Sequence, residues 1–166
     1  MKSYRYILVF LIMVVVQVLL DNFFPLSRYV LISVLPALIL VLPVDTRPIV
    51  AMLLSFALGL AVDFFSTGML GMSSLALVPV GLVRSAVIAG VFGDELTSRG
   101  DELSVQRLGV PKMVLTCLIL CSVFFVVYVL VDSAGTVSFW PAALRFALST
   151  LVSTPVCVFV VRQFRP

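Results

Sequence analysis

The feature that most constrains this chain is a series of six long apolar runs, each bounded by proline, glycine or charged residues. A helix needs about 20 predominantly apolar residues to cross the roughly 30 Å hydrocarbon core of a bilayer. The runs cover residues 6–20, 29–42, 49–65, 73–91, 113–131 and 140–161. We therefore predict that residues 1–166 form a single six-span transmembrane domain.

The composition excludes a soluble domain. Apolar residues make up 62% of the chain and charged residues 11%, whereas soluble proteins show about half and about a quarter. A water-soluble domain of this length buries only about 70% of its surface, too little to hide so many apolar side chains. The alternating pattern of a membrane barrel is missing, and backbone hydrogen bonds in lipid must close within each span. An all-α, integral membrane six-helix bundle is the expected fold.

The distribution of positive charge predicts the orientation. With six crossings and a cytoplasmic amino terminus, eight of the nine Lys and Arg residues outside the spans face the cytoplasm, and Arg28 faces outward. The second run has only 14 residues, a length often found in re-entrant segments. If it did not cross, seven positive charges would lie inside and two outside. The positive-inside rule favours the first arrangement, with both termini cytoplasmic.

The residue types argue against an enzyme. Histidine is absent, which removes the usual general base and the commonest metal ligand. Cys117, Cys121 and Cys157 lie inside apolar runs, where buried thiols usually serve packing. The net charge of +3 is small and scattered, unlike a nucleic-acid interface. We predict no catalysis, no cofactor, no metal and no nucleic-acid partner.

Small residues predict which helices pack together, because they let backbones approach closely in lipid. The third run carries Ser55 and Gly59, with Asp63 one turn further, and the fourth run carries Gly81, Ser85 and Ala89. We expect these two helices to form the centre of the bundle. Residues 7–20 contain neither Gly nor Ala, so the first helix is expected to face lipid or a partner helix.

Three ionisable residues lie within the runs, where each costs about 2.5–3.5 kcal/mol at the membrane centre. Asp63 and Arg145 fall near the outer ends of the third and sixth helices, so we predict that they pair. Arg84 lies deeper, and we expect its side chain to reach the cytoplasmic headgroups. Two kinds of role stay open for these charges: anchoring of the helices, or a functional role in partner contact or in a small polar cavity.

Two further segments have polar patterns. The sixth run carries four hydroxyl residues that are expected to hydrogen-bond between helices: Ser149, Thr150, Ser153 and Thr154. The loop 92–112 holds seven of the nineteen charges and repeats Gly-Asp-Glu-Leu at a spacing of seven residues. This loop is either a solvated linker or a docking helix for a cytoplasmic partner.

The segment 59–85, GLAVDFFSTGMLGMSSLALVPVGLVRS, resembles the signature region of the MreD family of bacterial rod-shape-determining membrane proteins. The matching positions are Gly59, Asp63, Gly68, Leu70 and Gly71. Arg84 is similar to an arginine that some branches place near the close of the same helix. Gln17 and Asn22 resemble polar positions of the family's first span, and LPVDTRP at 42–48 resembles its proline-bearing turn.

The resemblance implies a non-catalytic scaffold subunit of the cell-wall elongation complex in the bacterial cytoplasmic membrane. Members bind the bitopic protein MreC and are grouped with MreB, the polymerase RodA and its transpeptidase. Their fold is similar to the substrate-binding subunits of energy-coupling-factor transporters. The residues expected to serve partner contact or helix packing are Ser55, Gly59, Asp63, Gly68, Gly71, Gly81, Arg84 and Arg145.

The alternative function is a solute-binding subunit of a vitamin-type transporter. Such a protein needs a pocket near the outer face, and the residues that would line it are Phe64, Phe65, Phe139, Trp140 and Asp63. The transporter family typically docks its coupling subunit through an Ala-x-x-x-Ala ridge on its first helix. The first run here has no alanine, which favours the scaffold.

Overall fold

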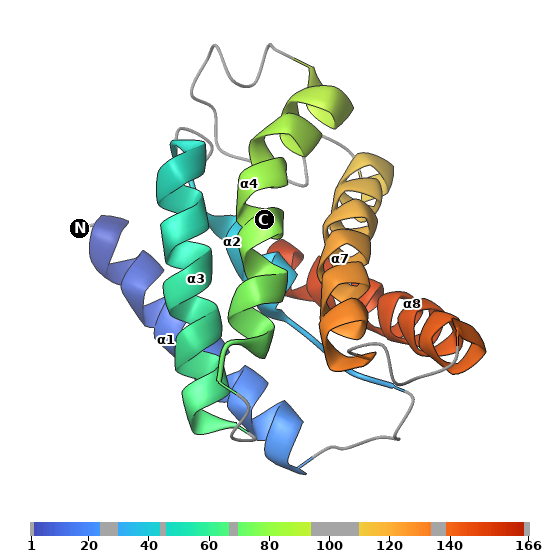
Figure 1. Ribbon diagram of the computed structural model, residues 1–166. Helices are drawn as coiled ribbons and strands as arrows, with labels where there is room; N and C mark the ends of the chain where they lie inside the picture. The colour runs from blue at the N-terminus through green and yellow to red at the C-terminus, as the bar shows by residue number, and fades with distance from the viewer. Residues whose placement is uncertain are drawn as a thin grey trace.

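The computed structural model describes residues 2–23, 30–43, 46–66, 70–93, 110–133 and 139–164. All regular structure in these ranges is helical, which confirms the predicted all-α, six-helix architecture (Figure 1). The helices are α1 (Lys2–Phe23), α2 (Leu35–Val41), α3 (Pro48–Phe65), α4 (Met72–Phe92), α7 (Val110–Ser133) and α8 (Phe139–Phe164).

Four helices are long and apolar enough to cross a bilayer, which agrees with a multi-pass membrane protein. They are Pro48–Phe65, Met72–Phe92, Val110–Asp132 and Trp140–Gln163. The stretch Leu11–Phe23 of α1 is a shorter apolar helix. It exposes Leu11, Val15 and Leu19 on one side while Met13 and Gln17 are buried, as expected for a first helix that faces lipid.

The second predicted span is wrong as a continuous helix. Residues 31–34 are not helical, and α2 has only seven residues, about 10 Å at 1.5 Å per residue. Two prolines explain its bounds. Pro36 has no amide hydrogen to donate to the carbonyl of Ile32, and its ring would clash there. At the other end, Leu42 precedes Pro43 and has an extended backbone with ψ of 151°, as the proline requires.

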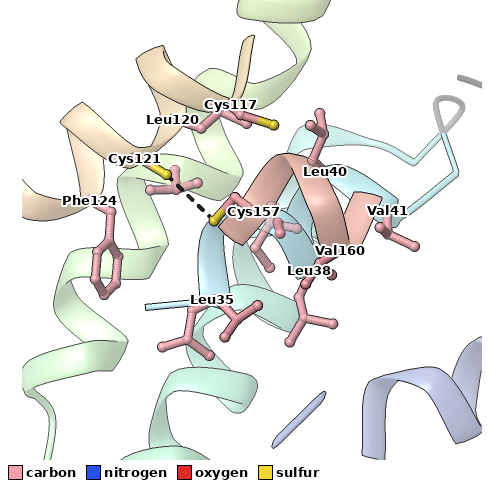
Figure 2. Packing of buried hydrophobic residues seen from close by; sticks show 14 of the residues in the cluster. Leu35, Leu38, Leu40, Val41, Cys117, Leu120, Cys121, Phe124, Cys157 and Val160 are labelled. Atoms are coloured by element: carbon pink, nitrogen blue, oxygen red, sulfur yellow. Dashed lines mark hydrogen bonds between the residues drawn. The ribbon is translucent and has the colours of Figure 1, made fainter. Parts of the chain in front are cut away.

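The short helix α2 lies at the centre of the bundle. Each of its seven residues is buried, and it contacts all five other described helices. Figure 2 shows Leu35, Leu38 and Leu40 of α2 beside Cys121 of α7 and Cys157 of α8. The expectation that α3 and α4 form the centre is therefore corrected, because α3 leaves a whole face exposed. Only a helix that is apolar on every side, such as LPALILV, can be enclosed in this way.

The predicted pairing of α3 with α4 is confirmed. The two helices lie side by side (Figure 1) and have the most extensive contact in the bundle. A Cβ atom on Gly81 would lie 2.4 Å from Oγ of Ser55 and 2.9 Å from the carbonyl oxygen of Ala51. A Cβ atom on Gly59 would lie 2.4 Å from Cα of Ser74. Both glycines are required because the facing backbones are too close for any side chain.

The close approach at Gly81 gives a test of this packing. Gly81→Ala should lower the free energy of unfolding by about 1–3 kcal/mol, because the new methyl group overlaps a backbone carbonyl that cannot move away. Gly90→Ala on the same helix is the matched control, since nothing lies within 4 Å of its Cβ position. Unfolding in mixed detergent micelles measures both variants. Equal stability of the two would contradict the α3–α4 contact.

Candidate functional site

The most polar region of the interior surrounds the non-helical residues 31–34. One side chain of α1, Gln17, is buried against this segment. Its Oε1 accepts a hydrogen bond from the amide of Val34 at 2.7 Å, and its Nε2 donates to the carbonyl of Ile32 at 3.2 Å and to Asp21 at 2.9 Å. A carboxamide is both donor and acceptor. Gln17 therefore supplies the partner that Pro36 denies to Ile32.

Two serines of α8 bind the same segment from another side. Oγ of Ser149 accepts from the amide of Leu31 at 3.0 Å, and Oγ of Ser153 accepts from the amide of Ser33 at 3.1 Å. The Ser153 hydroxyl also donates to the carbonyl of Leu31 at 3.3 Å. Residues four apart share a helix face, so α8 presents both hydroxyls together. The predicted hydrogen bonds between helices are therefore wrong in their partners: these two serines bind backbone groups of an irregular segment, and the Thr154 hydroxyl donates to the carbonyl of Thr150 in its own helix at 2.7 Å.

The cysteines complete the contact between α8 and this segment. The thiol of Cys157 donates to the carbonyl of Ser33 at 3.4 Å, and its sulfur lies 3.6 Å from that of Cys121 on α7 (Figure 2). Cys117, Cys121 and Cys157 are buried free thiols. Their predicted packing role is confirmed.

Asp63 closes the amino-terminal end of α4. Its carboxylate accepts from the amides of Gly71 at 3.0 Å, Ser73 at 3.1 Å and Ser74 at 3.3 Å. The negative charge is favourable there because helix amino termini carry unpaired N–H groups and a partial positive charge. Gly71 has φ of +101°, a conformation that glycine adopts without strain. The carboxylate of Asp63 on α3 thus holds the amino-terminal end of α4, and Gly71 is the residue immediately before that helix.

The predicted Asp63–Arg145 pair is wrong. Arg145 forms an ion pair with Asp132, near the end of α7, and the two side chains are 25% and 28% exposed. Sequence reasoning missed Asp132 because it lies one residue beyond the fifth apolar run. Asp132 and Arg145 lie at the same predicted membrane face, and this shared depth is the feature from which their pairing could have been predicted.

The expectation that Arg84 reaches the headgroups is also wrong. Its guanidinium is buried and donates to the carbonyls of Leu42 and, at 3.1 Å, Pro43. These carbonyls follow the last turn of α2, where the partial negative charge of a helix terminus favours a cation. Backbone acceptors inside the protein therefore replace the headgroups as partners of this charge.

A small polar cavity lies beside the irregular segment. Its volume is about 20 Å³, and its lining includes Gln17, Asp21, Ser33, Ser73 and Tyr128. A cavity of this size has room for about one water molecule. It is not the pocket expected for the transporter alternative, because Phe64, Phe65 and Trp140 are 68%, 62% and 81% exposed. These three side chains are thus exposed at the surface, and the side chain of Phe139 lies outside the described residues.

The remaining positions of the sequence prediction are Ser55, Gly68 and the charged loop. Ser55 is buried at the α3–α4 contact, where its hydroxyl donates to the carbonyl of Ala51 at 2.7 Å. Gly68 lies outside the described residues, as does most of the charged loop, residues 94–109. The described site is thus a set of polar side chains that hydrogen-bond to backbone amides and carbonyls inside an apolar bundle.

Comparison with known proteins gives no further assignment: no family model matches this chain, and no curated protein or solved structure is significantly similar to it.

Replacing the carboxamide tests the role of Gln17. Gln17→Leu keeps the approximate volume but leaves the Val34 amide and the Ile32 carbonyl unpaired, and a buried unpaired group costs about 1–3 kcal/mol. We expect the free energy of unfolding in micelles to fall by at least that amount. Ser122→Ala is the control, because the Ser122 hydroxyl bonds only to the carbonyl of Leu118 in its own helix. Comparable losses in both variants would contradict the proposed bridge.

A double-mutant cycle tests the ion pair. Asp132→Asn and Arg145→Gln should each destabilise the protein, and the double variant should lose less than the sum by about 0.5 kcal/mol or more. The cycle with Asp63→Asn and Arg145→Gln should be additive, since these residues have different partners. Chemical unfolding of the purified variants measures both cycles. Coupling in the second cycle but not in the first would reverse the assignment.

Proposed function

We propose that this chain is a non-catalytic scaffold subunit of the bacterial cell-wall elongation complex, of the MreD type. In this proposal it lies in the cytoplasmic membrane with both termini cytoplasmic. It binds an MreC-like bitopic protein and contacts a RodA-type polymerase, its transpeptidase and MreB. Its action is to position these partners through helix contacts.

The observation that carries the proposal is that the polar groups of the interior are hydrogen-bonded within the chain, whereas the surface exposes apolar helix faces. The buried polar groups Gln17, Asp63, Arg84 and Ser153 are engaged by backbone groups of the chain itself. The outward faces of α1 and α3 expose large apolar side chains, among them Leu11, Val15, Leu53, Phe56 and Leu60. Such a molecule is rigid inside and presents helix faces outside, as a membrane scaffold requires.

The geometry of the motif that resembles MreD supports the same proposal. Gly59 lets α3 approach the start of α4, Asp63 caps that start, and Gly71 precedes it with a positive φ. Three of the residues shared with the family pattern, Gly59, Asp63 and Gly71, thus lie together where α3 meets the start of α4. A scaffold would need these residues to hold its shape. Their contacts are explained by helix packing, and no bound substrate is needed to account for them.

One observation favours the second candidate, a vitamin-type solute-binding subunit. Irregular backbone at membrane depth commonly lines the binding sites of transporters, and residues 31–34 are irregular here. The cavity beside them, however, is about 20 Å³, whereas ligand pockets measure roughly 300–1,000 Å³. The size of the cavity favours the scaffold.

Co-purification distinguishes the two functions. A tagged chain is isolated in mild detergent from the bacterium that encodes it, beside an unrelated multi-pass protein with the same tag. We expect an MreC-like protein and wall-synthesis enzymes to accompany the chain alone, and depletion of the chain to turn rod-shaped cells round. Recovery of a bound vitamin with an ATPase module, in cells of unchanged shape, would overturn the proposal.

A further inference from the structure

A groove of about 570 Å³ runs between α7 and α8. Its α8 wall extends from Phe146 to Arg162, about 24 Å at 1.5 Å per residue, and its α7 wall consists of Val114, Leu118 and Ser122. Both helices are long and apolar enough to span the membrane. The hydrocarbon core of one leaflet is about 15 Å deep, so the groove is long enough to hold a lipid acyl chain.

The groove offers no free hydrogen-bond donor between its ends. The hydroxyls of Ser122 and Thr154 donate to carbonyls in their own helices, at 2.8 Å and 2.7 Å. The hydroxyl of Thr150 is buried beneath the wall and is closed to the groove. The remaining lining residues, apart from Arg162, are apolar. A polar ligand would lose its hydration here without compensation, whereas an apolar chain has no hydrogen bonds to lose.

The one charged residue of the groove is Arg162, the last of the α8 residues that line it. Its side chain is exposed and lies at the end of the apolar stretch Trp140–Gln163. Within the part of the chain that the structure describes, no carboxylate forms an ion pair with it. The groove therefore combines an apolar wall with an uncompensated positive charge at one end.

Contacts between α7 and α8 indicate the depth of this charge. Asp132 pairs with Arg145 near one end of the two helices, and Cys121 contacts Cys157 further along both. The two contacts are separated by similar lengths of α7 and α8, so the helices run in roughly opposite directions. The end of α8 and the start of α7 therefore lie at the same membrane face, which places Arg162 near the depth of lipid headgroups.

We propose that the α7–α8 groove binds one anionic phospholipid, with an acyl chain along its apolar wall and the phosphate beside the guanidinium of Arg162. A guanidinium can form two parallel hydrogen bonds to a phosphate, and basic pockets between membrane helices bind anionic headgroups. A helix of the same length, about 10 Å across, would occupy roughly 1,900 Å³, too much to enter this groove. The inference goes beyond the proposed scaffold function and does not depend on it.

Titration with lipids of defined headgroup tests the site. The full-length chain in non-ionic detergent receives phosphatidylglycerol or phosphatidylcholine with the same long acyl chains, and native mass spectrometry gives the affinity of the first bound lipid. We expect phosphatidylglycerol to bind about 5-fold more tightly, the contribution of one cation near a membrane surface. Short-chain phosphatidylglycerol and inorganic phosphate should compete poorly, because neither fills the groove.

A pair of charge variants assigns the headgroup preference. Arg162→Gln should bring the two affinities close to equality. Lys112→Gln is the matched control, because Lys112 is an exposed cation near the start of α7, at the same membrane face, and does not line the groove. It should leave the preference for phosphatidylglycerol unchanged.

A pair of size variants assigns the acyl chain independently of charge. Leu118→Trp places a larger side chain in the groove and should weaken the binding of both long-chain lipids by at least about 4-fold, equivalent to one buried methylene group. Leu115→Trp is the control on the same helix, since Leu115 does not line the groove and the two leucines are 49% and 43% exposed at positions 115 and 118.

Several results would overturn the proposal. Equal affinity of the wild-type chain for the two lipids would do so, as would equal effects of Arg162→Gln and Lys112→Gln or of the two tryptophan variants. Competition by inorganic phosphate as strong as that by long-chain lipid would indicate a simple anion site. Energy transfer between labelled copies of the chain that Leu118→Trp reduces and added phospholipid does not would assign the groove to a second copy.

Discussion

Hydrocarbon offers no hydrogen-bond partner, so each backbone amide and carbonyl within the membrane must find one in the protein. Helices meet this constraint internally, but residues 31–34 do not, because Pro36 prevents the helix from extending to them. The protein meets the constraint with side chains instead. Gln17 of α1 and the serines Ser149 and Ser153 of α8 pair with the exposed backbone groups. The position of α2 at the centre of the bundle depends on these bonds.

The same requirement explains the buried charges. Asp63 lies at the amino end of α4 and Arg84 beyond the carboxyl end of α2. Each charge has the sign that complements its helix terminus, and each pairs with groups that would otherwise be unpaired in an apolar interior. An isolated charge would be expensive in such surroundings. Here the charge and the helix end satisfy each other, which keeps both within the bundle.

Much of this fold follows from the sequence. Apolar runs of sufficient length predict the four long helices, and small residues four apart on each helix, such as Ser55 and Gly59 or Gly81 and Ser85, predict the contact of α3 with α4. The second apolar run, residues 29–42, wrongly predicts a spanning helix, because an enclosed short helix and a spanning helix are equally apolar. Pro36 is the residue from which a later helix start could have been predicted, since proline disfavours helix before it. The partners of Arg84 are backbone carbonyls, which no pattern of side chains reveals. The choice of Asp132 over Asp63 for Arg145 depends on how the helices come together in space.

The bonds to residues 31–34 join helices that are far apart in the sequence, since Gln17 lies in α1 and Ser149 and Ser153 lie in α8. Helices enter the bilayer in order as the ribosome makes them. The segment 31–34 therefore has only Gln17 as a side-chain partner from another helix until α8 emerges from the insertion machinery. A polypeptide that lacks α8 therefore leaves the amides of Leu31 and Ser33 without these partners in the interior of the bundle. The core is complete only when α8 has joined it.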